Sequence, residues 1–291
     1  MFAIKQLSSA DALRYGSLTF RYVQPRLHRI DENPHIIAFG AESTSSSRPI
    51  GLVVVERQPG IRVYNIISLF VEEEFRRLGL GSTLLKQVES SLQAEHCSTL
   101  KMIYYAGKAI TPVLESFLHH TGWSPPSLEG KVYKADTRIS GAPWLKKIGL
   151  PNTMSSFYWR DLCVEERKRL IELEDKLYLP FLSPFKKDLT LEASNSLGLK
   201  VEGETVGWCI TYRIAEDTIL YDSVFVKPEY QLSGCSFILL GQSIALQLEQ
   251  QIPYAMFAVN ESSPYMRKIV DRWLAPYTVQ VSEKRLAIKI F

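Results

Sequence analysis

A short glycine-containing loop is the segment of this sequence best suited to binding a phosphate. It reads Arg76-Arg77-Leu78-Gly79-Leu80-Gly81-Ser82 and lies shortly after a strand-like run, directly before a helical pattern. The first turn of a helix carries N–H groups without internal acceptors, and the helix dipole is positive there, so an anion is favoured. Gly79 and Gly81 allow positive φ and remove Cβ atoms, so backbone amides can approach a diphosphate closely. Arg76 or Arg77 can add positive charge.

The same loop has two other interpretations. Many turns before helices carry glycines for backbone reasons only, so the pattern also fits a structural turn. A dinucleotide site of the Rossmann type fits less well, because the third glycine of its G-x-G-x-x-G pattern would be Leu84. The loop also does not open the first βαβ unit of the chain.

The elements expected around the loop would hold it in an α/β domain. Hydrophobic periodicity and turn residues predict their order. We expect a helical region over 9–27, strands over 35–40, 50–55 and 63–71, a helix around 84–92, a strand over 99–105 and a helix over 112–120. The loop therefore connects the third strand to the helix that follows it.

The pattern around the loop occurs a second time. Ser68-Leu69-Phe70-Val71 matches Ser223-Val224-Phe225-Val226, and Gly79 matches Gly234. The differences 223 − 68 and 234 − 79 both give 155, so no gap is needed between strand and loop. Such an internal repeat predicts two copies of one domain. The alternative is one large α/β domain whose strand–loop–helix units look alike by chance.

Composition between the copies sets the expected boundaries. The interval after residue 137 contains Gly141, Pro143, Gly149 and Pro151 with little periodicity, as in a linker. We therefore expect a first domain over 1–137, a linker over 138–153 and a second domain over 154–291.

The loop and its surroundings resemble a known family. The pattern Arg/Gln-x-x-Gly-x-Gly/Ala, after a strand reading Leu-Phe-Val and before an amphipathic helix, is similar to motif A of the GNAT superfamily of N-acetyltransferases. Arg76, Gly79 and Gly81 stand at its fixed positions, and Gly122-Trp123 resembles the Gly-Phe/Trp that commonly closes the fold. The resemblance implies two tandem GNAT-like domains, each an α/β (α+β) fold with a mixed sheet. In the second copy Ser236 replaces the last glycine or alanine and the loop has no arginine, which implies a degenerate, mainly structural partner.

The resemblance also implies the reaction. An acyl group, acetyl in the first instance, would pass from acyl-CoA to a primary amine of a small molecule, peptide or protein lysine, with acetyl-CoA or another acyl-CoA as co-substrate and no metal. A backbone amide of the motif strand would face the thioester carbonyl as an oxyanion donor. The residues expected at the cofactor are Leu69, Phe70, Val71, Arg76, Arg77, Leu78, Gly79, Leu80, Gly81, Ser82 and Thr83.

The catalytic residues are harder to assign from the resemblance. Many family members carry a tyrosine five residues before the closing aromatic, and that position is Leu118 here. Nearby substitutes are Tyr104 or Tyr105 on the strand. On the helix they are His119 or His120. Adjacent strand residues point to opposite faces, so only one of the two tyrosines can face the cleft. We name Tyr105 and His119 as the catalytic candidates.

Composition excludes several other classes. The chain has 291 residues, of which 34 are basic and 31 acidic, a net charge of +3 that does not favour nucleic-acid binding. Its four cysteines form no C-x-x-C pair, and no His stands at metal-ligand spacing, which indicates thiols in a reducing compartment. No apolar run approaches the roughly 20 residues that cross a bilayer. We expect a soluble, cytoplasmic protein without a membrane partner, and leave a homodimer open.

The second copy is rich in aromatic residues. A groove between two such domains would suit the acceptor amine. The apolar segment 178–185 contains Pro180 and Pro184 and is expected to be a loop, either packed between the halves or forming a lid over a long acyl chain. Three functions therefore remain open: an N-acetyltransferase, a long-chain N-acyltransferase, and an acyl-CoA-binding scaffold without catalysis.

Overall fold

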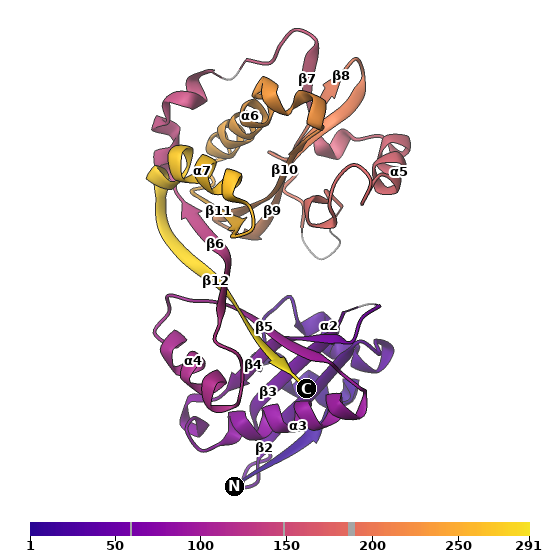
Figure 1. Ribbon diagram of the computed structural model, residues 1–291, viewed down its shortest axis with the longest axis vertical. Coiled ribbons are helices and arrows are strands. Elements are labelled where there is room, and N and C mark those ends of the chain that lie inside the picture. The colour runs from indigo at the N-terminus through magenta and orange to yellow at the C-terminus, as the bar shows by residue number, and fades with distance from the viewer. Residues whose placement is uncertain (59, 148, 186–189) are drawn as a thin grey trace. The chain divides into compact units, whose positions relative to one another are not determined.

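The computed structural model describes residues 1–58, 60–147, 149–185 and 190–291. The chain divides into two compact units (Figure 1). The first unit comprises Met1–Glu129 together with Glu283–Phe291, and the second comprises Gly130–Ser282. Both are mixed α/β structures, and each is described by itself below.

The first unit is built on a sheet with the strand order β1-β2-β3-β4-β5-β12. Neighbouring strands are antiparallel except β4 and β5, which are parallel. The strands are β1 Phe2–Gln6, β2 Ile36–Ser43, β3 Pro49–Arg57, β4 Val63–Val71, β5 Thr99–Tyr105 and β12 Thr278–Ile290, and the helices are α1 Ser9–Ala12, α2 Gln24–His28, α3 Leu80–Ala94 and α4 Thr111–His120.

Each face of this sheet has its own core. Leu84 and Val88 of α3 and Leu118 of α4 pack on one face, which we call the α3/α4 face. Leu27 of α2 packs with Leu52 and other apolar residues on the opposite, α1/α2 face. The apolar residues of α3 recur every three or four positions, so one stripe of the helix meets the sheet and its polar side faces solvent.

The second unit repeats this plan in the strand order β6-β11-β10-β9-β8-β7. Only β10 and β11 are parallel among its pairs. Its strands are β6 Ser127–Ala135, β7 Met154–Tyr158, β8 Leu197–Val201, β9 Glu204–Ala215, β10 Thr218–Val226 and β11 Tyr254–Asn260, and its helices are α5 Val164–Glu172, α6 Cys235–Glu249 and α7 Pro264–Trp273.

The repeat expected from the sequence is confirmed in the structure. Strand β4 begins at Val63 and β10 at Thr218, and helix α3 begins at Leu80 and α6 at Cys235, a difference of 155 in both cases. The ends of these elements differ by the same 155 residues. The two copies therefore share one register through strand, loop and helix.

The last strand of each unit comes from the other half of the chain. Strand β6, which follows α4, pairs with β11 of the second unit. The end of β12 pairs with β5 of the first unit from Lys284 to Ile290. Ala287 of this strand is fully buried in the core of the first unit, and the Lys289 ammonium lies 2.7 Å from a carboxylate oxygen of Glu89 on α3.

This exchange gives boundaries that differ from those expected from composition. The first unit ends at Glu129 rather than 137 and takes in 283–291, which we had assigned to the second domain. The expected linker 138–153 lies within the second unit and contains the end of one short 3₁₀ helix and the whole of another, Pro143–Lys147; residue 148 is outside the described part. Ile139 in this stretch packs in the core of the second unit.

The segment 178–185 also packs within the second unit. The Tyr178 hydroxyl donates to the Leu170 carbonyl at 2.7 Å, and the Trp208 indole N–H donates to the Leu182 carbonyl at 3.0 Å. Leu179 and Phe181 point outward, each 54% exposed. These contacts attach the segment to its own sheet and to α5.

Candidate cofactor-binding site

The end of β4 separates from β5 and opens a gap in the sheet of the first unit. The parallel pairing runs from Val63–Thr99 to Ile66–Met102 and ends there, although β4 continues to Val71. A β-bulge in β4 coincides with this point, since the pairing with β3 shifts by one residue between Ile66 and Ser68. Backbone groups of β4 on its β5 side are thus available to a ligand over the expected segment 69–71.

The loop after β4 has the backbone that phosphate binding requires. Gly79 has φ of +80° and caps the N-terminus of α3, with no side chain capping the helix and no acidic residue in the first turn. The Thr83 amide and hydroxyl both donate to the Gly79 carbonyl at 3.0 Å, so the helical hydrogen bonds begin there. The amides of residues 80–82 precede the first helical hydrogen bond and have no helical acceptors, and they lie at the positive end of the helix dipole.

The two arginines of the loop differ in their roles. The Arg76 Nε donates to the Val71 carbonyl at 2.9 Å, which fixes the turn from strand to helix. Arg77 has φ of +61° and an exposed side chain, so its guanidinium is free to approach a phosphate. Leu78 is 64% exposed beside it.

The other expected cofactor residues divide between the two faces of the sheet. Leu69 and Val71 pack on the α3/α4 face, whereas Phe70 points to the α1/α2 face and is 36% exposed. Leu80 is buried in the core, so it contributes only its backbone amide. A Cβ on Gly81 would lie 3.5 Å from the Phe117 ring of α4, which places α4 next to the start of α3.

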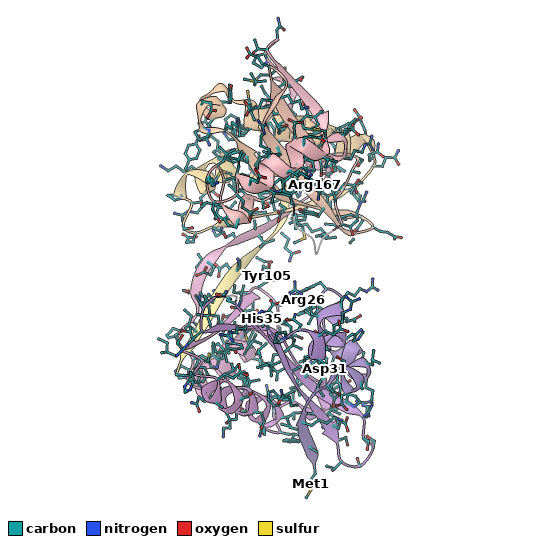
Figure 2. The ribbon with its side chains drawn as sticks, turned by 90° about the vertical axis from the view of Figure 1, so that its right-hand side faces the viewer. Met1, Arg26, Asp31, His35, Tyr105 and Arg167 are labelled. Carbon is teal, nitrogen blue, oxygen red and sulfur yellow. The ribbon has the colours of Figure 1, made fainter. Side chains whose placement is uncertain are left out.

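Tyr104, rather than Tyr105, lies on the α3/α4 face. Tyr104 packs against the core of that face, and its hydroxyl donates to a Glu115 carboxylate oxygen of α4 at 2.7 Å. Burial, together with the bond to Glu115, raises the pKa of Tyr104, so its hydroxyl stays protonated at neutral pH. Tyr105 points to the opposite face and is 51% exposed at the surface (Figure 2). Sequence alternation showed that the two tyrosines differ in face but did not show which faces the helices.

The exchanged strand contributes to the surroundings of Tyr104. Arg285 of β12 stands directly opposite Tyr104 in the strand register, and its Nη1 donates to the same Glu115 oxygen at 2.6 Å. Its Nε and Nη2 both donate to Glu283. Arg285 therefore holds Glu115 in place, a role that its position far along the sequence concealed.

His119 lies away from this group. It is exposed on α4, and its ring meets the ring of His120 edge-on with centroids 5.6 Å apart. Leu118, at the position where the resemblance led us to look for a tyrosine, is 1% exposed and packs in the core. The structure brings Tyr104 and Glu115 together but does not bring His119 to them.

A pair of hydroxyl groups lies on the opposite face of the gap. The Thr19 hydroxyl donates to the Ser68 hydroxyl at 2.8 Å, and Ser68 is 5% exposed at the bulge of β4. Thr19 belongs to the loop between α1 and α2. This contact holds the loop over the place where β4 leaves β5.

The second copy has the same backbone but different side chains at the equivalent place. Gly234 has φ of +76° and caps α6, and Gln231 donates to the Val226 carbonyl at 3.0 Å as Arg76 does to Val71. Phe237, however, stands at the position of Ser82. Its ring packs against Trp144 at 5.9 Å and Trp273 at 6.3 Å, so aromatic rings cover the first turn of α6.

The other face of the second copy is filled as well. Phe225, at the position of Phe70, is only 8% exposed because the Trp208 ring lies 4.5 Å away and the Tyr178 ring 5.9 Å away. Both sides of the β10 strand end are therefore covered by the unit's own aromatic residues.

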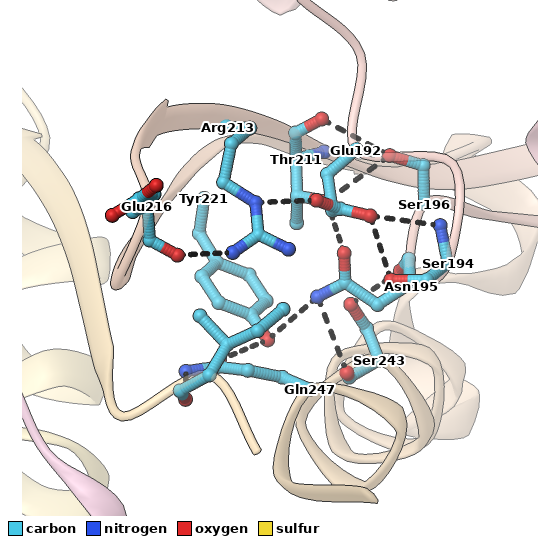
Figure 3. Close-up of polar contacts among 11 residues, drawn as sticks. Glu192, Ser194, Asn195, Ser196, Thr211, Arg213, Glu216, Tyr221, Ser243 and Gln247 are labelled. Carbon is cyan, nitrogen blue, oxygen red and sulfur yellow. Dashed lines mark hydrogen bonds and ion pairs between the residues drawn. The ribbon is translucent and has the colours of Figure 1, made fainter. Parts of the chain in front are cut away.

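A hydrogen-bonded network fills the interior of the second unit. Figure 3 shows Asn195 at its centre: its amide nitrogen donates to the Tyr221 hydroxyl at 3.3 Å, and its oxygen accepts from the Thr211 hydroxyl at 2.6 Å. Tyr221 in turn donates to Gln247 of α6 at 2.8 Å. Because these buried groups satisfy one another, the network serves to fix α6 on the sheet.

Two further observations concern metals and membranes. Among the described residues no group of three or more His, Cys, Asp or Glu side chains could hold a metal ion. In the same part of the chain, no helix has the length and apolar character needed to span a bilayer.

Comparisons with known proteins bear on the family and the fold. Residues 4–108, which include the loop, match the model of the acetyltransferase (GNAT) family. A search of curated protein sequences finds no match. The fold is therefore that of a tandem GNAT protein, and residues 4–108 of its first unit are similar to the acetyltransferase (GNAT) family.

Solved structures match the whole chain. A tandem GNAT protein from the clavulanic acid biosynthesis pathway is similar with a TM-score of 0.75 and 13% identity, covering 100% of this chain and 98% of that one. A GCN5-related N-acetyltransferase from Sphaerobacter thermophilus has a TM-score of 0.62 and 14% identity, covering 99% and 95%. A conserved protein from Enterococcus faecalis V583 has a TM-score of 0.58 and 14% identity, covering 100% and 73%. At these identities the likeness shows the fold alone.

Proposed function

We propose that the first unit transfers an acetyl group from acetyl-CoA to a primary amine. The observation that carries this proposal is the uncapped first turn of α3 beside the open end of β4. The diphosphate of the cofactor binds the amides of residues 80–82, with Arg77 adding charge. The pantetheine arm then lies along residues 69–71, between β4 and β5.

The chemistry follows from this placement. The neutral amine nitrogen attacks the thioester carbonyl carbon, and a β4 amide stabilises the negative charge on the carbonyl oxygen. The C–S bond then breaks, which completes the amide and releases the coenzyme A thiolate. The thiolate takes a proton from the Tyr104 hydroxyl, which is protonated at neutral pH, and the phenolate regains a proton from water, while the proton of the amine passes to water. Glu115 and Arg285 hold Tyr104 in position.

The second copy supports the fold and does not take part in transfer. Its counterpart of the cofactor site carries Phe237 and the neighbouring tryptophans instead of an open first turn. A single cofactor therefore binds each chain.

A specific observation favours a second candidate, an acyl-CoA-binding protein without catalysis. Leu118 replaces the tyrosine that the resemblance leads one to expect, and a buried leucine cannot donate a proton. Tyr104 supplies the missing hydroxyl in our proposal, so the two candidates differ in what happens after the cofactor binds.

Two measurements on the intact chain separate these candidates. Calorimetry with coenzyme A is expected to show one site per chain, and acetyl-CoA with a panel of primary amines is expected to release free thiol. Ser82→Phe, which introduces the side chain of the second copy, should abolish CoA binding. Ser90→Phe, at an exposed position on the same helix, is the matched control and should bind normally. Binding without thiol release on any amine would favour the non-catalytic candidate, and no binding would refute both.

A further inference from the structure

The acceptor must reach the thioester from the α1/α2 face. Helices α3 and α4 and their core cover the other side of the gap, where Leu69, Tyr104 and Phe117 pack. On the α1/α2 face the loop between α1 and α2 meets β4 through the Thr19–Ser68 contact. The surface around that contact therefore receives the amine in the proposed reaction, on which this inference rests.

Aromatic rings dominate this surface. Phe20 and Tyr22 of the loop stack with ring centroids 5.5 Å apart and planes 8° from parallel, and each is 58% exposed. Tyr105 at the end of β5 is 51% exposed, and Phe70 of β4 is 36% exposed. Burial and then the charge of Tyr105 raise the pKa of Tyr22.

An exposed cluster of aromatic rings is the kind of apolar patch that marks ligand-binding surfaces. The equivalent strand position in the second copy shows the alternative, because Phe225 there is covered by Tyr178 and Trp208. In the first unit the corresponding Phe70 has no such cover. An aromatic ring of a ligand can stack on Phe20 and Tyr22 and bury part of their surface.

A basic side chain stands beside these rings. Lys284 of β12 is opposite Tyr105 in the strand register, whereas Arg26 of α2 pairs with a Glu56 carboxylate oxygen at 3.3 Å and so adds little net charge. The nearby acidic residues Glu283 and Glu115 bind Arg285, beside Tyr104 on the opposite face of the sheet. A second ammonium on the acceptor would thus meet positive charge, which disfavours it.

We propose that the acceptor is an aromatic monoamine, a primary amine joined by a short linker to a ring that stacks on Phe20 and Tyr22. The ring fixes the amine over the gap at Ser68, where the thioester carbonyl lies. The positive surroundings also favour the neutral form of the amine, which is the form that attacks. Diamines and polyamines are poor acceptors.

The test compares matched amines with acetyl-CoA and the full-length protein. 2-Phenylethylamine is the probe, 2-cyclohexylethylamine tests for stacking at similar size, and 1,4-diaminobutane tests for charge. We expect kcat/KM for the aromatic amine to exceed that for the cyclohexyl amine by about 3- to 10-fold, the range that ring stacking supplies. We expect kcat/KM for the diamine to be lower than that for the cyclohexyl amine.

Variants tie the preference to the rings. Tyr22→Ala should raise KM for 2-phenylethylamine by about 3- to 10-fold while leaving KM for acetyl-CoA unchanged. Tyr22→Phe should restore most of the lost affinity because it keeps the ring. Tyr265→Ala removes a tyrosine that is 74% exposed in the second unit and serves as the matched control. Equilibrium dialysis of N-acetyl-2-phenylethylamine, which needs no turnover, should show the same order of affinities among these variants.

The possible results distinguish this inference from the function beneath it. If kcat/KM is higher for the diamine than for the aromatic amine, the aromatic acceptor is refuted while N-acetyl transfer stands. The same holds if Tyr22→Ala leaves KM for 2-phenylethylamine unchanged. Failure to bind coenzyme A would remove the proposed function, and this inference with it.

Discussion

Replacing Gly79 by aspartate tests the phosphate site, and the repeat supplies its own control. Gly79→Asp and Gly234→Asp alter the N-caps of α3 and α6, whose φ angles are +80° and +76°. A Cβ at either position meets no atom within 4 Å, so neither variant causes a steric clash. Each costs about 1–2 kcal/mol for placing a side chain in the left-handed region. Both should therefore lower the melting temperature of their unit by about 3–8 °C.

The two variants should differ in ligand binding. A carboxylate about 4 Å from a phosphate costs about 4 kcal/mol at the effective dielectric of a protein surface, and less after screening by salt. Gly79→Asp should therefore raise the Kd of coenzyme A by at least about 100-fold, whereas Gly234→Asp should leave it unchanged.

Calorimetric titration at two salt concentrations measures both effects. The loss in Gly79→Asp should shrink as salt rises, because it is electrostatic. If Gly234→Asp weakened binding as much as Gly79→Asp, the site would not belong to the first unit. Undiminished binding by Gly79→Asp would refute the role of the α3 amides.

Four further outcomes are expected. Tyr104→Phe should lower kcat by about 100-fold without changing KM for acetyl-CoA, as steady-state kinetics will show; an unchanged kcat would exclude it as the acid. Cys163 alone should react with a thiol reagent in the native protein, because the other three thiols are buried and burial raises the pKa of Cys209 to about 12; fast labelling of a second thiol would contradict this. Despite the opposing effect of burial, hydrogen bonds from Ser194 and the ion pair with Arg213 lower the pKa of Glu192. The carboxylate therefore stabilises the fold above its ordinary pKa of 4.5, and this stabilisation is lost as pH falls through the pKa of the folded state. Glu192→Gln should thus reduce the melting temperature at pH 7 more than at pH 3, and equal reductions at both pH values would contradict this linkage. Deleting 283–291 should unfold the first unit, seen as loss of its amide protection in hydrogen exchange, and a protected first unit would deny β12 its role.

Much of the fold could be predicted because its signals are local. The strand, the loop and the following helix each leave a periodic or compositional pattern within a few residues, and the repeat at 155 aligned them twice. The positive φ at Gly79 was also predictable, since only the residue type and its place before a helix were needed.

Long-range pairing could not be predicted in the same way. The end of β12 reads as an alternating strand whichever neighbour it pairs with, so its partnership with β5 leaves no mark in the sequence. Arg285 was missed for this reason. The orientation of Tyr104 depends on Glu115 and Arg285, and neither contact is visible from the alternation of the strand.

The side chains that distinguish the loop of the second copy were visible in part. Its missing arginine and glycine led us to expect a weaker cofactor site, but the aromatic cover on the first turn of α6 depends on Trp144 from the expected linker. The sequence around a tryptophan in a Pro- and Gly-containing stretch does not predict which helix it packs against. Only the folded chain shows that the stretch belongs to the second unit.

The exchange of strands between the two units has a consequence for the synthesis of the protein. A ribosome makes residues 283–291 long after residues 1–129, yet they complete the sheet of the half that was synthesised earlier. The β5 edge of the N-terminal half therefore stays unpaired until residues 283–291 have been synthesised. Because each unit takes a strand from the other half of the chain, we expect that neither half expressed alone forms a complete sheet.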